Sequence, residues 1–272
     1  MKTLKSYHKE HIEKMKKMKQ ISLGVFCILL ILFAFIFIKM YNAIINPNTS
    51  TKEDYSLYIY SNDDFETIKK TLYSDSIIIN KKSFEWFAKK IDYPEYIKSG
   101  HYVIKNGMNN RQLLNMLRSG SQKPVKFTFN NIRTIEQLAT RIDEQLETDS
   151  LSILNAIRAN ETLKEMGFDK ESAAALFIPN TYELYWNIEA EEFVEKMINE
   201  YNHFWNKDRL NKAKKLNLTP IEVSVLASIV DKETIKTSEM PRIAGVYINR
   251  LKKNWLLQAD PTLVFAIGDF EI

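Results

Sequence analysis

Apolar residues occur along the chain in one long run, followed by many short periodic segments. Residues 21–38 contain no charged side chain. Met40 and Tyr41 extend the run past Lys39 to about the length of a helix that crosses a bilayer. The alternative is a cleaved signal peptide, but the run is long and no small-x-small cleavage site follows it. We therefore predict a retained transmembrane helix over residues 21–41.

A polar segment follows and leads into a first folded domain. Residues 42–54 contain a proline and several turn formers, and this composition is typical of a tether. Alternating and helical apolar spacings then predict the order β-α-α-β, and a further helix should begin after Asn109 and end at Gly120. The four elements of the β-α-α-β part are predicted at 55–60, 63–72, 83–91 and 101–104.

From residue 124 the pattern becomes mostly helical. Residues 125–130 predict one short strand, and apolar residues at spacings of three and four predict the helices that follow. The whole chain is thus expected to have an α+β fold with two folded domains, 55–123 and 124–272. The helices of the second domain are predicted at 134–142, 150–157, 161–166, 191–205, 219–233 and 239–251.

The helix predicted over residues 219–233 carries the best catalytic candidate. Thr219 and Glu222 form a capping-box pattern, with proline at the first helical position. At 100° per residue Glu233 lies about 20° from Leu226, inside the apolar stripe, whereas Asp231 lies about 140° away. Desolvation favours the neutral form of an acid directed into an apolar surface, as a general acid requires. The ordinary alternative for Glu233 is an ion-pair partner at a helix end.

Charge is distributed unevenly between the tail and the rest of the chain. Residues 1–20 carry seven Lys and two Glu, a net charge of +5, whereas the 272-residue chain has +4, so residues 21–272 carry −1. The positive charge is therefore a topological signal, which predicts a cytoplasmic basic tail over residues 1–20 and an exported remainder. Nucleic-acid binding loses its main support, since the folded part is not basic.

The residues available for catalysis exclude several kinds of chemistry. The single cysteine, Cys27, lies in the apolar run, so the exported part can use neither disulfides nor a thiol nucleophile. His101 and His203 are far apart, and no metal-binding motif is present. We therefore expect no metal and no cofactor.

Three segments resemble one enzyme family. ASIVDKET (227–234), IAGVYINRL (243–251) and LQADPT (257–262) are similar to the signature of the MltG (YceG-like) endolytic transglycosylases, membrane-anchored enzymes that cleave peptidoglycan glycan strands. The family usually reads ASIVEKET, and the resemblance identifies Glu233 with its catalytic acid. Two departures are Asp231, where the family has glutamate, and Ala259, where it commonly has Ser or Thr.

The resemblance also implies residues that contact the glycan. Gln258, Asp260 and Thr262 alternate in what we expect to be an extended segment, so all three would point the same way; a structural turn around Asp260 is the alternative. Further candidates come from the family's F-x-P-x-T-Y segment and from the second motif, although packing would explain the aromatic residues equally well. They are Asn180, Thr181, Tyr182 and Asn249.

Further expectations concern the first domain and the extent of the chain. The β-α-α-β order resembles a LysM-like module, the kind of fold that holds N-acetylglucosamine, and the alternative is a support domain without a sugar site. The expected architecture is thus a transmembrane helix, a LysM-like module and a mainly helical α+β YceG-like catalytic domain. Family members continue beyond the DPT motif, so this domain is expected to be incomplete here.

The resemblance implies a function at the outer face of the cytoplasmic membrane. The expected enzyme is a lyase that cleaves the MurNAc–GlcNAc bond of nascent strands, leaves 1,6-anhydroMurNAc ends and terminates elongation. Its expected partners are glycan strands, the cytoplasmic membrane, and cell-wall synthases or division proteins. The alternative is a non-catalytic, peptidoglycan-binding membrane scaffold that recruits such proteins.

Overall fold

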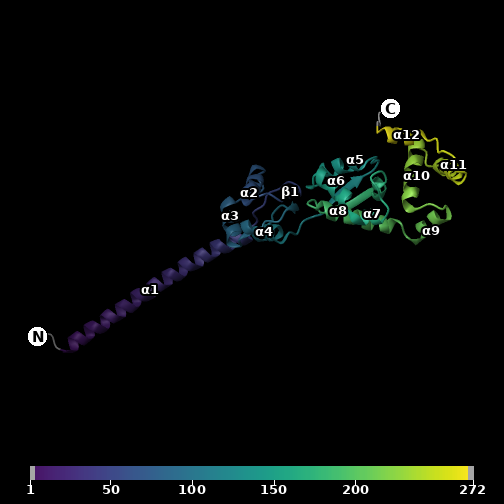
Figure 1. The fold of residues 1–272 in the computed structure, drawn as a ribbon. Helices are drawn as coiled ribbons and strands as arrows, with labels where there is room; N and C mark the ends of the chain where they lie inside the picture. The colour runs from purple at the N-terminus through teal and green to yellow at the C-terminus, as the bar shows by residue number, and fades with distance from the viewer. Residues whose placement is uncertain (1–3, 269–272) are drawn as a thin grey trace. The chain divides into compact units, whose positions relative to one another are not determined.

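The chain has a mixed α+β fold that is mostly helical (Figure 1). The structure is a computed structural model that describes residues 4–268, with side chains from Met15 onward except those at 16 and 20. Its contacts divide the chain into two compact units, Met1–Lys123 (unit 1) and Pro124–Ile272 (unit 2). Residues 1–3 of the predicted tail and 269–272 of the predicted second domain lie outside the described residues.

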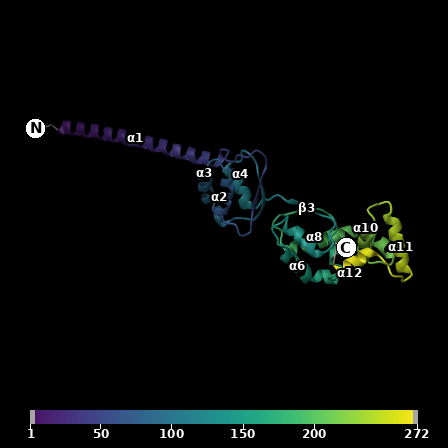
Figure 2. The ribbon, with the colours of Figure 1, turned by 90° about the horizontal axis from the view of Figure 1, so that it is seen from above.

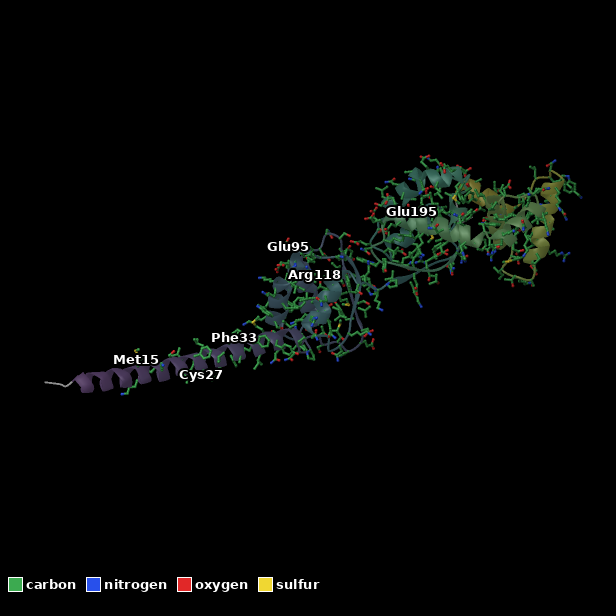
Figure 3. The ribbon with its side chains drawn as sticks, turned by 90° about the horizontal axis from the view of Figure 1, so that it is seen from below. Met15, Cys27, Phe33, Glu95, Arg118 and Glu195 are labelled. Carbon is green, nitrogen blue, oxygen red and sulfur yellow. The ribbon has the colours of Figure 1, made fainter. Side chains whose placement is uncertain are left out.

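Unit 1 begins with one long helix, α1 (Leu4–Ile45). Within it, the segment Lys17–Ile45 is long and apolar enough to cross a membrane. Its described side chains are exposed along most of its length, including Phe33 and the free Cys27 (Figure 3). The helix therefore contains the predicted span and extends back into the predicted basic tail. By length and composition it is compatible with a membrane anchor.

The folded part of unit 1 has the predicted β-α-α-β order. Its two strands pair antiparallel, with Leu57 opposite Tyr102, and the inward-facing residues of both strands are buried. Asn109 caps the last helix and Gly120 ends it in the left-handed conformation, as predicted. The elements are β1 (Tyr55–Ile59), α2 (Phe65–Ser74), α3 (Lys81–Lys90), the 3-10 helix η1 (Tyr93–Glu95), β2 (Gly100–Ile104) and α4 (Asn110–Ser119).

The prediction of a polar tether over residues 42–54 was wrong for its first half. α1 continues to Ile45, and two residues later the chain already belongs to the folded part of unit 1. Pro47 forms a β-bridge with Asn109, and Thr49 forms one with Ile78. Asn48 and Thr49 are buried. Polar residues can be buried when their groups are hydrogen-bonded, and composition alone does not reveal such partners.

A network of buried amides fixes this junction. Asn48 Nδ2 donates to Asn110 Oδ1 at 2.7 Å, and Asn80 N donates to Asn48 Oδ1 at 2.6 Å. Asn110 Nδ2 in turn donates to the carbonyl of Ala43, in the last turn of α1, at 2.7 Å. This contact satisfies a carbonyl that a helix end otherwise leaves without an intrahelical partner. The end of α1 is therefore bound directly to α4 and to the residues before α3.

Unit 2 is built on a second antiparallel strand pair covered by helices (Figure 2). Phe127 pairs with Tyr182 in its register, and both are buried. The second strand and the helix α9 were not predicted. The elements up to residue 215 are β3 (Val125–Phe129), α5 (Ile135–Asp143), α6 (Ser150–Ala159), α7 (Glu161–Glu165), the 3-10 helix η2 (Ala173–Leu176), β4 (Asn180–Leu184), α8 (Ala190–Phe204) and α9 (Lys207–Lys215).

Three further helices complete unit 2 around a small core of their own. They are α10 (Pro220–Glu233), α11 (Met240–Lys252) and α12 (Asp260–Ile267). Leu226, Ile229 and Val230 of α10 pack in this core with Tyr247 of α11 and with Ala259. The core holds the end of α10 beside α11, and this is where the candidate site lies.

Candidate functional site

The helix that carries Glu233 begins as the sequence predicts. Thr219 Oγ1 accepts a hydrogen bond from Glu222 N at 3.2 Å, and Glu222 Oε2 accepts one from Thr219 N at 2.7 Å. Both halves of the capping box are therefore present, with Pro220 at the first helical position. Because the start of α10 is fixed, the register that places Glu233 at its last position is fixed as well.

Glu233 follows the buried face of α10 but is itself exposed. The apolar stripe is formed as predicted, since Leu226, Ile229 and Val230 are all buried. The expected burial of the acid was wrong, because Glu233 is the last residue of the helix and lies beyond the core. The surroundings of its carboxylate are thus set by a specific neighbour instead of by desolvation.

That neighbour is Tyr247, on α11. Its hydroxyl donates a hydrogen bond of 2.7 Å to Glu233 Oε1. Burial of the ring raises the pKa of Tyr247 to about 12, and the hydrogen bond to Glu233 and the charge of its carboxylate act in the same direction. Tyr247 therefore stays protonated and remains a donor at any physiological pH. This role of Tyr247 was not predicted from the sequence, in which its only signal is the place of the residue within the second motif.

Two charged residues lie close to this hydrogen bond. The guanidinium of Arg250 is 5.9 Å from the centre of the Tyr247 ring, and it also donates to the carbonyl of Leu257. The charge of Asp260 adds to the rise in the pKa of Tyr247, so this predicted residue belongs to the same neighbourhood. Residues from α10, α11 and the start of α12 thus meet around Tyr247.

Asn249 and Asp231 lie on other faces of their helices. Two positions along a helix correspond to a turn of about 200°, so Asn249 is on the far side of α11 from Tyr247, where it is exposed. The same geometry separates Asp231 from Glu233 on α10. Asp231 is exposed and pairs with Lys232 at 3.3 Å. Its solvated position agrees with the helical-wheel prediction for this acid.

The predicted extended segment around Asp260 is a helix start instead. Gln258 has a positive φ of 50°, Ala259 is the N-cap, and α12 begins at Asp260. Thr262 Oγ1 donates to the carbonyl of Ala259 at 2.6 Å. Gln258, Asp260 and Thr262 therefore do not point the same way, because helical rotation replaces the alternation of a strand.

The aromatic segment before α8 contributes a strand, and one of its predicted contacts is a core residue. Tyr182 is buried, stacks on Phe129 with ring centres 5.6 Å apart, and donates its hydroxyl to the carbonyl of Ile178. The expectation that Tyr182 contacts substrate is therefore not supported. Asn180 and Thr181 are exposed on β4, and the Thr181 hydroxyl is 2.8 Å from that of Thr128 on β3.

Acids and histidines elsewhere do not gather into a metal site in the part of the chain that the structure describes. No group of three or more His, Cys, Asp or Glu side chains is placed there to hold an ion. The chemistry that this arrangement offers is therefore that of an exposed carboxylate at a helix end, oriented by a tyrosine hydroxyl.

Comparison with known proteins identifies close similarity over most of the chain. The endolytic murein transglycosylase of Streptococcus pneumoniae (strain D39) is 27% identical over 250 residues, which cover 81% of this chain and 44% of that protein. The endolytic murein transglycosylase of Bacillus subtilis (strain 168) is 23% identical over 234 residues, covering 80% of this chain and 64% of the relative. The chain thus spans about half the length of these relatives.

A solved structure and a family model agree with these relatives. The crystal structure of a YceG-like protein from Listeria monocytogenes matches the fold with a TM-score of 0.50 and 23% identity, covering 80% of this chain and 77% of that one. The model of the YceG-like family matches residues 57–272, which include both folded parts and the Glu233–Tyr247 pair. The chain therefore belongs to the YceG-like family.

Proposed function

We propose that this protein is a membrane-anchored endolytic murein transglycosylase that cleaves the MurNAc–GlcNAc bond of nascent glycan strands. Membership of the YceG-like family and the names of the two relatives support this activity. The observation that carries the proposal is the hydrogen bond from the Tyr247 hydroxyl to the Glu233 carboxylate, at the end of α10. It provides one oriented acid, on rigid elements, at the surface where a long polymer can reach it.

One acid is sufficient for lytic transglycosylation. Hydrolysis of a glycoside ordinarily uses two carboxylates. In the proposed reaction Glu233 donates its proton to the glycosidic oxygen as the bond to the MurNAc anomeric carbon breaks, and positive charge develops at that carbon. The resulting carboxylate then takes the proton of the MurNAc C6 hydroxyl, whose oxygen closes the 1,6-anhydro ring. The proton lost in the first step is regained in the second, and no water is consumed.

Tyr247 is the positioning residue in this scheme. Its hydroxyl occupies Oε1 of Glu233, which leaves Oε2 to exchange the proton with substrate. A hydrogen bond to the carboxylate also stabilises the anion that forms after the first transfer. Asp260, whose charge acts on Tyr247, is proposed as a substrate contact beside this pair. Gln258, Thr262, Asn180, Thr181 and Asn249 are proposed as contacts farther along the glycan.

Unit 1 has a proposed role in holding the enzyme at its substrate. We assign α1 as a single-pass anchor whose N-terminus remains in the cytoplasm, which the basic residues before the apolar run support. We also assign the folded part of unit 1 as a LysM-like module that contacts N-acetylglucosamine, on the strength of its β-α-α-β order. Glycan made at the outer face of the cytoplasmic membrane would then be within reach of the folded part of unit 1.

The test of the activity is the Glu233→Gln variant. Glutamine keeps the size of the side chain and cannot donate the acid proton, so the release of 1,6-anhydroMurNAc ends should fall by about 10²–10⁴-fold. The 272-residue chain in detergent is incubated with glycan strands, and mass spectrometry of the digested strands measures these ends. The control, Asp231→Asn, should lose far less because Asp231 lies on another face of α10.

Other outcomes point to other functions. Full activity of the Glu233→Gln variant would overturn the assignment of the acid. Strands left unchanged by the unmodified protein would indicate a binding scaffold, and strands with reducing MurNAc ends would indicate a hydrolytic muramidase.

A further inference from the structure

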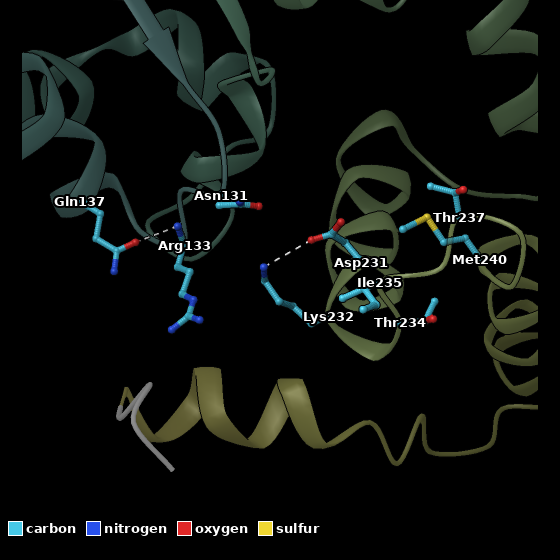
Figure 4. A pocket seen from close by; sticks show the side chains of 9 residues that line it. All are labelled: Asn131, Arg133, Gln137, Asp231, Lys232, Thr234, Ile235, Thr237 and Met240. Atoms are coloured by element: carbon cyan, nitrogen blue, oxygen red, sulfur yellow. Dashed lines mark hydrogen bonds and ion pairs between the residues drawn. The ribbon is translucent and has the colours of Figure 1, made fainter.

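A cavity of about 680 Å³ lies beside the end of α10, and Glu233 is not among its lining residues (Figure 4). One wall is the connection between β3 and α5 together with the first turn of α5, and the other is the end of α10 with the residues that follow it. The lining residues are Asn131, Arg133, Gln137, Asp231, Lys232, Thr234, Ile235, Thr237 and Met240.

The first wall is held in place by its own backbone. Asn131 has a left-handed φ of 52°, which reverses the chain directly after β3. Gln137 Oε1 accepts a hydrogen bond from Arg133 N at 3.0 Å, and Thr134 caps α5 by accepting from Gln137 N. In a capping box the Gln137 side chain would accept from Thr134 N, whereas here it accepts from the backbone N–H one residue earlier. Arg133 therefore lines the cavity from a turn whose backbone is held by these hydrogen bonds.

The charges in the cavity suit an anion. Arg133 and Lys232 are cationic and exposed, and Asp231 is the one acid among the lining residues. The Asp231–Lys232 pair has a separation of 3.3 Å, with 54% and 41% of the two side chains exposed. An exposed pair of this kind contributes little free energy, so Lys232 can exchange Asp231 for a ligand. The guanidinium of Arg133 has the planar donor geometry that matches a carboxylate.

The cavity adjoins the proposed catalytic acid through the chain itself. Lys232 and Thr234 line the cavity, and Glu233 lies between them in sequence. Adjacent Cα atoms are about 3.8 Å apart, so the backbone of Glu233 borders the cavity. The loop after α10 is also fixed, because Thr234 Oγ1 donates to Glu239 Oε2 at 3.1 Å.

We propose that this cavity binds the carboxylates of the peptide stems carried by the glycan strand next to the cleaved bond. The inference rests on the proposed function for the identity of the polymer. The sugar units of such a strand are uncharged, and the anionic groups are those of the stems attached to the lactyl group of MurNAc. Arg133 and Lys232 bind a stem carboxylate, while Asn131, Gln137 and Thr237 offer donors and acceptors to its amides. The cavity thereby selects strands that still carry their stems.

Strand binding tests the proposal without requiring turnover. The 272-residue chain carrying Glu233→Gln is titrated with two strand preparations, one with intact stems and one from which the stems have been removed at the lactyl group and the lactyl carboxylates so exposed have been converted to uncharged amides. We expect stem-bearing strands to bind about tenfold more tightly, as for loss of a charge-assisted hydrogen bond. Adding Arg133→Gln or Lys232→Gln should remove this preference and leave the affinity for stem-free strands unchanged.

Two further variants fix the sign and the location of the effect. Asp231→Asn removes the one negative charge in the cavity, so it should strengthen binding of stem-bearing strands only. Lys164→Gln is the matched control, because Lys164 is also an exposed lysine in an ion pair of unit 2, at 2.8 Å from Glu161. It should leave both affinities unchanged.

The outcomes separate this proposal from the proposed activity. Equal affinity for the two strand preparations, or a stem preference that survives both cavity variants, would overturn the cavity assignment. The production of 1,6-anhydro ends by the chain with intact Glu233 is measured separately. Its absence would overturn the activity and leave the stem preference as a property of the cavity.

Discussion

Glu233 and Asp231 stand two residues apart on α10 and have different surroundings. Glu233 accepts a hydrogen bond from a buried tyrosine, whereas Asp231 pairs with an exposed lysine and lines an open cavity. Only the first arrangement gives a carboxylate a fixed orientation, because the donor belongs to a residue held in a core. The two acids are therefore suited to different tasks, proton transfer for Glu233 and control of charge in the cavity for Asp231.

Removal of the Tyr247 hydroxyl tests its role as a positioning residue. Tyr247→Phe keeps the ring in the core and takes away the hydrogen bond to Glu233. We expect kcat for release of anhydro ends to fall about tenfold, the value for loss of one hydrogen bond to a charged group, with KM unchanged. Steady-state kinetics on glycan strands measures both constants.

The control for this variant is Tyr201→Phe. Tyr201 is also buried, with its pKa raised by burial to about 12, but it belongs to the main core of unit 2. This change should leave kcat as it is. A Tyr247→Phe variant with unaltered kcat would show that the hydrogen bond has no part in the reaction.

The sequence predicted the acid and missed its partner for a physical reason. The capping box of α10 joins Thr219 to Glu222, three residues apart, so local rules were sufficient to locate the helix and its apolar face. The bond between Tyr247 and Glu233 spans 14 residues and depends on how α10 packs against α11. Periodicity alone placed Tyr247 in a buried stripe, which is correct for its ring and says nothing of its hydroxyl.

At the scale of elements, the junction between α1 and the folded part of unit 1 shows how polar residues can hold a helix end against a folded domain. Asn110 is fully buried, and its side chain bonds both to Asn48 and to the last turn of α1. A buried amide of this kind is stabilising only while all its partners are present. The junction should therefore be sensitive to the loss of a single side chain.

Asn110→Ala tests the junction. The change leaves the side-chain amide of Asn48 and the carbonyl of Ala43 without the hydrogen bonds that they make to Asn110. The free energy of unfolding of the folded part of unit 1 should therefore fall by about 1–3 kcal/mol. Hydrogen exchange of the buried amides of β2 measures this in the full-length protein. Asn115→Ala, on the exposed face of the same helix, should have little effect. Equal protection in the two variants would contradict the proposed importance of the network.

The elements that the sequence missed or misassigned had weaker or competing signals. β4 contains only two inward residues, Tyr182 and Leu184, which are too few for their alternation to identify a strand in a segment rich in aromatic residues. α12 had helix signals in its acidic first turn, in Pro261 and in Gly268 at its end, which takes a left-handed φ of 75°. The resemblance to a motif with alternating polar residues outweighed them. The prediction of a tether was wrong because the hydrogen-bond partners of its residues lie about 30 to 60 residues away in sequence. Asn48, for example, bonds to Asn80 and Asn110.

At the scale of the whole molecule, buried tyrosines make the fold sensitive to alkaline pH. Burial raises the pKa values of Tyr102, Tyr182, Tyr201 and Tyr247 to about 12, from 10.0 in the unfolded chain. Between pH 10 and about pH 12, these tyrosines lose their protons in the unfolded state and keep them in the folded state. The stabilisation is thus fully present below pH 10 and is lost as the pH rises through about 12.

A spectroscopic titration checks this expectation. The tyrosinate absorbance that these four residues contribute should appear in the folded protein only near pH 12 or on unfolding, whereas in concentrated urea it should appear near pH 10. Full tyrosinate absorbance of the folded protein near pH 10 would contradict the burial of these hydroxyls.

The short distance between the end of α1 and the first buried residue of unit 1 has a mechanical consequence. Only Asn46 and Pro47 separate Ile45 from Asn48, and an extended chain advances at most about 3.6 Å per residue. When α1 lies in a bilayer, Asn48 is therefore within roughly 11 Å of the helix end. The anchor that we propose would then fix the height and tilt of the folded part of unit 1 above the lipid.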